Sequence, residues 1–204
     1  MVEPVELHTA RLVLSAPVTA DIDAITAACQ DPDVQRWTTV PSPYSRSDAE
    51  SFVNAYVPSG WRSGAARTWA VRRLREGGAD LVGMIGLEGI HSGAGEIGYW
   101  LDPAARGGRL MAEAVEAVIE HGFDPGGIGL DRIVWRALAG NVASAAVVRR
   151  IGFHFEGVRR LGAVVRDVRA DEWTAAILST DDRTPVGGWP PATLGTGTTP
   201  TLSA

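Results

Sequence analysis

The stretch of residues 96–111 has the residue types and spacing of an anion-binding site. An apolar strand pattern through Leu101 enters a loop with Gly107 and Gly108, and an amphipathic helix pattern begins at Leu110. Backbone N–H groups in the first turn of a helix lack internal partners, and the helix dipole favours a negative charge there. Glycine lets the backbone approach a phosphate closely. The loop is therefore a candidate pyrophosphate site; a plain strand–turn–helix connection is the alternative interpretation.

Candidate groups for proton transfer occur before and after this loop. Glu96 is the leading candidate for a general base, acting through a water chain, with Glu88 and His91 as runners-up. An exposed strand-end carboxylate and an exposed histidine are the ordinary alternatives. Asn141 and Ser144 have the spacing of a helix N-cap and its third helical residue. Asn141 can serve as a cap and also bind a ligand, because an amide has more donors and acceptors than capping uses.

Composition excludes several other kinds of site. The chain has 204 residues, of which 45% are hydrophobic, a length that fits one domain with a buried core. Its only cysteine excludes an internal disulfide and a cysteine-rich zinc site, and its four histidines have no ligand spacing, so no metal is expected. The net charge of −5 argues against nucleic acid as a partner and is compatible with a protonated amine.

No segment of the sequence looks like a membrane anchor or a secretion signal. No apolar run approaches the roughly 20 residues of a membrane span. Glu3 and Glu6 interrupt any signal-peptide pattern at the N-terminus. We therefore expect a cytoplasmic protein without a membrane partner.

The first quarter of the chain predicts one strand and two helices. The strand is expected over residues 6–15, and a helix follows through residues 24–29, ended by a proline. Residues 34–44, with Trp37 and several prolines, are interpreted as an irregular surface segment. Ser47 and Glu50 form a capping-box pattern that would open the second helix.

The rest of the chain predicts a sheet with helices. The expected strands are 68–74, 81–90, 96–101, 133–138, 153–161 and 172–178, and the expected helices are 110–123 and 142–151. Antiparallel strands followed by alternating strands and helices imply a mixed sheet with helices on its faces. We expect a domain over residues 1–182. Residues 183–204, rich in Thr, Gly and Pro, are expected to form a flexible tail in which Trp189 is the only candidate anchor.

Several motifs in order resemble those of the GNAT superfamily of acyltransferases, in the branch similar to the RimJ/RimL ribosomal-protein N-terminal acetyltransferases. The resemblance covers residues 6–180. Its motifs are Leu7-His8-Thr9-Ala10-Arg11-Leu12-Val13-Leu14, Pro41-Ser42-Pro43-Tyr44, Val82-Gly83-Met84-Ile85-Gly86, the glycine loop, Trp135 to Ser144, Arg149-Arg150-Ile151-Gly152-Phe153 and Glu156-Gly157. Several ordered motifs are far more specific than one.

The resemblance implies an α/β (α+β) GNAT fold, with a central mixed, mostly antiparallel sheet and helices on both faces. It implies N-acetyl transfer from acetyl-CoA to a primary amine. The pantetheine arm would insert between the strand ending near Leu101 and the strand 131–138, with Asn141 as its partner. Ser144 would be the general acid, since Val148 occupies the position where many relatives have tyrosine. The implied cofactor-binding residues are Trp100, Leu101, Arg106, Gly107, Gly108, Arg109, Leu110, Met111, Asn141 and Ser144.

The loop departs from the family pattern at two positions. If Arg106 is the first residue of the motif, Arg109 replaces its second glycine and Met111 replaces a small residue. Arg109 can add a cation beside the phosphates, or its bulk can block their close approach. This departure keeps open a degenerate GNAT domain that binds a partner or an acyl-CoA without turnover.

The acceptor is expected to be an amine of low basicity. An α-amine has a pKa of about 7.7–8.0 against about 10.4 for lysine, so it needs less help from a base. A peptide or protein N-terminus is therefore the first expectation, and a small-molecule or antibiotic amine is the alternative. Trp37, Tyr44 and Trp100 can line the acceptor pocket or pack in the core, and Asp167 and Asp171 can attract a cationic substrate or be solvated. Dimers are common among relatives, which makes a homodimer a candidate.

Overall fold

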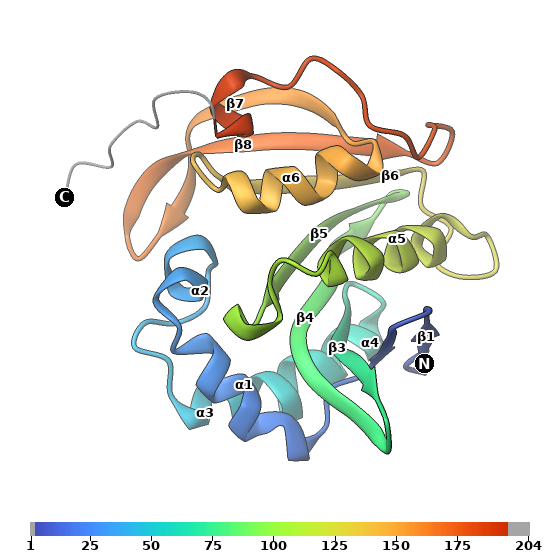
Figure 1. Ribbon diagram of the computed structural model, residues 1–204, viewed down its shortest axis with the longest axis vertical. Helices are drawn as coiled ribbons and strands as arrows, with labels where there is room; N and C mark the ends of the chain where they lie inside the picture. Colours follow the sequence, from blue (N-terminus) through green and yellow to red (C-terminus); the bar gives the residue numbers. More distant parts are fainter. Residues whose placement is uncertain (1–2, 196–204) are drawn as a thin grey trace.

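The computed structural model describes residues 3–195, and its strands form one eight-stranded sheet in the order β1-β2-β3-β4-β5-β6-β8-β7 (Figure 1). All neighbouring strands are antiparallel except β5 and β6, which are parallel. The strands are β1 (Leu7–His8), β2 (Leu12–Ser15), β3 (Arg67–Arg75), β4 (Gly78–His91), β5 (Ala94–Leu101), β6 (Arg132–Leu138), β7 (His154–Val165) and β8 (Val168–Leu178). The mixed, mostly antiparallel sheet that the sequence predicts is confirmed.

Helices cover both faces of this sheet because strand residues alternate between two cores. In β3, Trp69 and Val71 pack in the core that contains α5 and α6, whereas Ala70 packs in the core that contains α1 and α3. In β4, Ile85 and Met84 divide in the same way. The helices are α1 (Ile22–Cys29), α2 (Pro32–Trp37), α3 (Arg46–Ser51), α4 (Val57–Ser63), α5 (Leu110–Phe123) and α6 (Val142–Ile151).

The parallel strands β5 and β6 separate halfway along their length. Their pairing runs from Ala94 opposite Arg132 to Ile97 opposite Trp135 and then stops. Beyond that point β5 stays paired with β4, and β6 stays paired with β8. The sheet therefore splits into two diverging halves (Figure 1), as the family resemblance implies.

Gly83 allows the end of β5 to lie close against β4. A Cβ atom at Gly83 would be 2.4 Å from the Trp100 carbonyl oxygen and 3.2 Å from the Leu101 Cα. Because the obstructing atoms are backbone, a larger residue would push the end of β5 away. Gly83 therefore helps to set the path of the strand that borders the opening.

Two predictions near the N-terminus are wrong. The single strand expected over residues 6–15 is two short strands, β1 and β2, paired with each other and joined by a turn in which Thr9 N–H donates to the Leu12 carbonyl at 3.0 Å. The segment expected to be irregular begins with a helix, α2. Asp31 caps this helix through a 3.0 Å bond from Val34 N–H, and Pro32 is its first residue. Proline is favourable there because the N–H it lacks would have no partner.

The capping box is also two residues earlier than predicted. Ser45 and Asp48 form it, with Ser45 N–H donating to Asp48 Oδ2 at 2.8 Å and Asp48 N–H donating to Ser45 Oγ at 3.3 Å. The helix continues from α3 through a π-helical turn at Phe52–Tyr56 into α4. Both pairs of residues have the correct spacing, and only the geometry distinguishes them.

Trp189 attaches the segment after β8 to the domain. Its side chain is 7% exposed, its Nε1 donates to the Phe153 carbonyl at 3.1 Å, and its ring centroid lies 5.3 Å from that of Phe155. A short 3-10 helix follows over Pro191–Leu194. Trp189, the candidate anchor in the sequence, is therefore packed against the domain. The domain boundary at residue 182 stays a prediction, and residues 196–204 of the expected tail lie outside the described residues.

Candidate functional site

A cavity of about 1150 Å³ opens where β5 and β6 separate. The last residues of β5, the loop before α5, and the first turns of α5 and α6 form one part of its wall. Residues of α2 and α3 and the following chain form the part that lies on the other face of the sheet. The cavity thus extends from one face of the sheet to the other through the split.

The loop before α5 presents unpaired backbone N–H groups at the rim of this cavity. The N–H groups of Leu110, Met111 and Ala112 have no acceptor within residues 3–195. Gly107 has φ +86°, and a Cβ atom there would meet nothing within 4 Å, so the space in front of it is open. Arg109, the N-cap residue, has φ +59°, a left-handed conformation unusual for a residue other than glycine. The sequence prediction of an anion site at this helix start fits this geometry.

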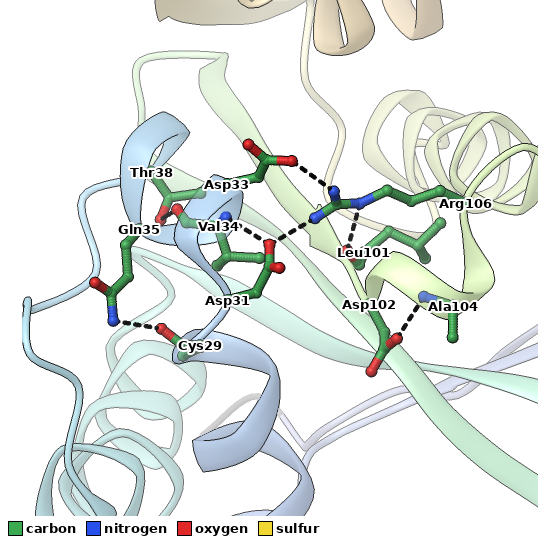
Figure 2. A network of polar contacts seen from close by, with 10 residues as sticks. All are labelled: Cys29, Asp31, Asp33, Val34, Gln35, Thr38, Leu101, Asp102, Ala104 and Arg106. Atoms are coloured by element: carbon green, nitrogen blue, oxygen red, sulfur yellow. Dashed lines mark hydrogen bonds and ion pairs between the residues drawn. The ribbon is translucent and has the colours of Figure 1, made fainter.

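The side chain of Arg106 ties this loop to α2 (Figure 2). Its guanidinium lies 3.0 Å from Asp31 Oδ1 and 3.1 Å from Asp33 Oδ2, and its Nε donates to the Leu101 carbonyl at 3.3 Å. Asp31 is at the same time the cap of α2. Two carboxylates match the charge of Arg106, and its backbone N–H donates to the Pro103 carbonyl at 3.2 Å, so this residue serves to hold the loop against α2.

Ser144, in the first turn of α6, belongs to a half-buried hydrogen-bond network. Its Oγ accepts from Trp135 Nε1 at 2.9 Å and donates to the Tyr99 hydroxyl at 3.0 Å. The Tyr99 hydroxyl in turn donates to the Ser144 carbonyl at 3.0 Å. Burial raises the pKa of Tyr99, so this phenol keeps its proton at neutral pH. Ser144 of α6 therefore links Tyr99 of β5 to Trp135 of β6 through hydrogen bonds between their side chains.

The sequence model of the family described as acetyltransferase (GNAT) domain matches residues 11–154. The chain belongs to the GNAT acetyltransferase family. The match begins at the N-terminal hairpin and includes the split strands, the loop before α5 and all of α6.

Individual relatives agree with this assignment. The chain is 36% identical to "Probable N-acetyltransferase YjcK" of Bacillus subtilis (strain 168) over 105 residues, which are 50% of this chain and 57% of the relative. It is 32% identical to the ribosomal-protein-serine acetyltransferase of Escherichia coli (strain K12) over 94 residues, 45% of this chain and 51% of the relative. These two matches thus span little more than half of each relative. The name of the second relative agrees with the RimJ/RimL-like branch that the motifs resemble.

A solved structure shows the same fold at lower sequence identity. The ribosomal L7/L12 alpha-N-protein acetyltransferase RimL, in complex with coenzyme A, superposes with a TM-score of 0.75 at 22% identity, over 86% of this chain and 98% of that chain. In this GNAT chain, none of the helices within residues 3–195 is both long and apolar enough to cross a membrane. Within the same residues, no group of three or more His, Cys, Asp or Glu is arranged to hold a metal ion.

Asn141 is the N-cap of α6 in this GNAT domain and also lines the cavity. Its Oδ1 accepts from Ser144 N–H at 3.1 Å, and its side-chain amide has no acceptor within the described part of the chain. Val148, which occupies the position of a tyrosine in many relatives, is fully buried in the core. The phenol nearest to Ser144 comes from Tyr99 in β5. Sequence analysis missed it, although strand alternation from Ile97 indicates the α6 side.

Two arginines that line the cavity have no acidic partner. The side chains of Arg109, in the loop, and Arg150, in the last turn of α6, make no ion pair or hydrogen bond with any residue between 3 and 195. The cavity-lining Arg106 and Arg136 are both paired with carboxylates. The unpaired positive charge of the cavity is therefore carried by α6 and the loop before α5. Sequence analysis did not identify Arg150, because its position on α6 alone does not show what it faces.

Glu96 lies on the other face of β5, toward α1 and α3. Its carboxylate accepts from Arg136 Nη1 at 2.7 Å. On the neighbouring strand β4, Glu88 is paired directly opposite Glu96 and accepts from the Tyr56 hydroxyl at 2.9 Å. Burial raises the pKa of Glu96; the nearby carboxylates act in the same direction, and Arg136 opposes them. Burial and the neighbouring Glu88 raise the pKa of Tyr56 to about 12. Glu96 and Glu88 both line the cavity, whereas His91 does not.

Aromatic residues form part of the cavity wall on the face of the sheet that α1 and α3 cover. Trp37, Tyr44 and Trp100 all line it, and Tyr44 is at the same time buried in the core beneath α1 and α3. The pocket and packing interpretations therefore both hold for Tyr44. Asp167 and Asp171, the candidates for attracting a cationic substrate, are in the β7–β8 hairpin and do not line the cavity. Asp171 instead accepts from Leu161 N–H at 2.8 Å.

Proposed function

We propose that this chain is an acetyl-CoA-dependent N-acetyltransferase that acts on a primary amine, with a peptide or protein N-terminal α-amine as its acceptor. The observation that carries the proposal is the cavity at the split between β5 and β6. It has unpaired backbone N–H groups at one rim and carboxylates and aromatic rings at the other. This arrangement provides an anion site and an amine site that meet at the split.

The chain's own groups suit coenzyme A. The free N–H groups at the start of α5 and the unpaired Arg109 and Arg150 are suited to its phosphates. The facing edges of β5 and β6 beyond Ile97 have no partner strand within the described residues, so an extended pantetheine arm can bond there as an added strand. When bound, acetyl-CoA supplies the activated acetyl group as a thioester.

Ser144 and Glu96 are proposed to move the protons. A thiolate leaving group needs only modest help, because the pKa of a thiol is about 8.5. Ser144 can give its hydroxyl proton to the leaving thiolate in the cavity and recover one from solvent water, while the Tyr99 hydroxyl, 3.0 Å away, keeps its own proton and orients the serine. On the other face of β5, Glu96 in its ionised form would accept the proton of the amine, directly or through water. Its raised pKa makes it a stronger base than an ordinary glutamate.

An α-amine fits the acceptor site better than a lysine amine. Its lower pKa leaves a far larger fraction unprotonated at neutral pH than a lysine amine has, so a single partly exposed carboxylate is sufficient as a base. The names of the ribosomal-protein-serine acetyltransferase and of RimL describe acetylation of ribosomal proteins, and for RimL specifically at an α-amine. We propose the same class of acceptor here, in a cytoplasmic enzyme. A homodimer stays a prediction from the resemblance.

Two measurements test the proposal. Isothermal titration should show acetyl-CoA binding, and release of free thiol should then be faster with peptides bearing a free N-terminus than with N-blocked peptides that contain lysine. Failure to bind acetyl-CoA at millimolar concentration would sink the enzyme proposal. Faster turnover of small amines or aminoglycosides would favour the small-molecule alternative, and binding without turnover of any amine would favour a degenerate domain.

A further inference from the structure

The turn between β1 and β2 is joined to the start of α5 by a group of polar contacts. Arg11 donates from Nε to Glu113 Oε2 at 2.6 Å, and its backbone N–H donates to Glu113 Oε1 at 3.0 Å. The Thr9 hydroxyl donates to the same Oε1 at 2.5 Å. Glu113, in the first turn of α5, is only 18% exposed. The carboxylate of Glu113 therefore accepts hydrogen bonds from two residues of the turn between β1 and β2, Thr9 and Arg11.

The same arginine also holds the phosphate loop directly. Arg11 Nη1 donates to the Gly108 carbonyl at 2.9 Å. Gly108 is the one residue from 106 to 112 that does not line the cavity. A planar trans peptide directs the carbonyl of one residue and the N–H of the next to opposite sides. A Gly108 carbonyl held by Arg11 therefore turns the Arg109 N–H away from Arg11, and this N–H has no acceptor within the described residues.

The charge of Arg11 is matched at its own side of the loop. Burial alone would raise the pKa of Glu113, but the hydrogen bonds from Thr9 and Arg11 hold it below its ordinary value of 4.5. Glu113 is therefore ionised at neutral pH and pairs with the guanidinium. Because Glu113 balances the charge of Arg11, the contribution of Arg11 to the loop is its hydrogen bond to the Gly108 carbonyl, which fixes the direction of the Gly108–Arg109 peptide plane.

We propose that Arg11, held by Glu113 and Thr9, is a positioning residue for the pyrophosphate of coenzyme A. It orients the Gly108–Arg109 peptide so that the Arg109 N–H joins the free N–H groups of the first turn of α5 at the cavity. This inference rests on the proposed function, because it requires coenzyme A as the ligand. It also gives a role to the Thr9-Ala10-Arg11 motif near the N-terminus.

The test compares a ligand that has the pyrophosphate with one that lacks it. Arg11→Gln should weaken the binding of coenzyme A at least tenfold in isothermal titration. It should leave kcat/KM for S-acetyl-pantetheine within twofold of the unaltered protein. Arg11→Lys should show a smaller loss of coenzyme A affinity than Arg11→Gln, because lysine keeps the positive charge. Some loss should remain, since one ammonium group cannot reach Gly108 and Glu113 with the geometry of a guanidinium. Glu113→Gln should weaken coenzyme A binding in the same direction.

Arg75→Gln is the matched control. Arg75 is also a surface arginine in a hairpin paired with a carboxylate, at 2.5 Å from Asp80, but it does not line the cavity, and its side chain makes no hydrogen bond or ion pair with the described residues of the loop before α5. This variant should bind coenzyme A normally. An equal loss with both ligands in Arg11→Gln, or unchanged coenzyme A binding, would overturn the positioning role. If Arg11→Gln does not fold, Arg11→Lys and Glu113→Gln decide in the same way. If the unaltered protein itself binds no coenzyme A, the proposed function fails first.

Discussion

Replacing Arg109 by glycine should weaken coenzyme A binding without destabilising the fold. Two unit charges about 4 Å apart interact by about 1 kcal/mol in water, and more where water is partly excluded. Because Arg109 is exposed at the rim, we expect a loss near the lower value, about five- to tenfold in Kd. The left-handed conformation at φ +59° costs a residue with a side chain about 1 kcal/mol, which glycine avoids. Affinity and stability should therefore not fall together.

Isothermal titration at low and high salt, with thermal unfolding in parallel, checks this expectation. Salt screens exposed charges, so the difference in affinity between the unaltered protein and the glycine variant should shrink at high ionic strength. Arg109→Asn is the control, because asparagine tolerates the left-handed conformation and has no charge. Arg109→Lys keeps the charge. Tighter binding by the glycine variant would show that the arginine obstructs the cradle. Unchanged affinity in the glycine and asparagine variants would refute both interpretations.

Four further substitutions test the remaining parts of the site and fold. Ser144→Ala should lower kcat about 100-fold and Tyr99→Phe about tenfold, with coenzyme A affinity within twofold by titration, and an unchanged kcat for both would contradict the proton path. The pKa of Glu96 is raised above its ordinary value of 4.5, so kcat/KM should fall as the pH drops through that raised pKa. Glu96→Gln should be slower, and its kcat/KM should lack this fall at low pH. If the unaltered protein and Glu96→Gln have the same pH profile, Glu96 is excluded as the base. Trp189→Ala removes a buried indole and its bond to Phe153, so the free energy of unfolding should fall by about 3–5 kcal/mol in a denaturant titration, whereas no change would show that this segment is not docked.

Local sequence signals predicted the elements on one side of the cavity well. Two of the helices that border it, α5 and α6, begin and end where the sequence placed them, at Leu110–Phe123 and Val142–Ile151. Each has a strong apolar period, and Asn141 is a strong cap. The failures near the N-terminus have a physical reason. Pro32 both ends one helix and is favourable as the first residue of the next, and overlapping Ser and acidic residues offer two capping boxes of equal spacing.

The contacts that shape the site join residues far apart in the sequence, so no local sequence pattern predicts them. Tyr99 meets Ser144 across 45 positions, and Arg11 meets Gly108 across 97. The sequence supplied the motif that contains Arg11 and the loop that contains Gly108, but not their contact. The same holds for Arg106, whose carboxylate partners in α2 are 73 and 75 positions away. Only the sheet order brings these segments together.

These long contacts also bear on the arginine that replaces the expected glycine. Residues held in left-handed conformations persist when the surrounding structure fixes them. Here the loop is held on one side by Arg106, through Asp31 and Asp33, and on the other by Arg11, through the Gly108 carbonyl. With its path set from outside, the loop does not depend on a glycine at position 109 for its shape. Arg109 can then add a cation at the rim at the modest cost of its backbone conformation, and the open space in front of Gly107 is retained. The departure from the family pattern is therefore compatible with an intact phosphate cradle.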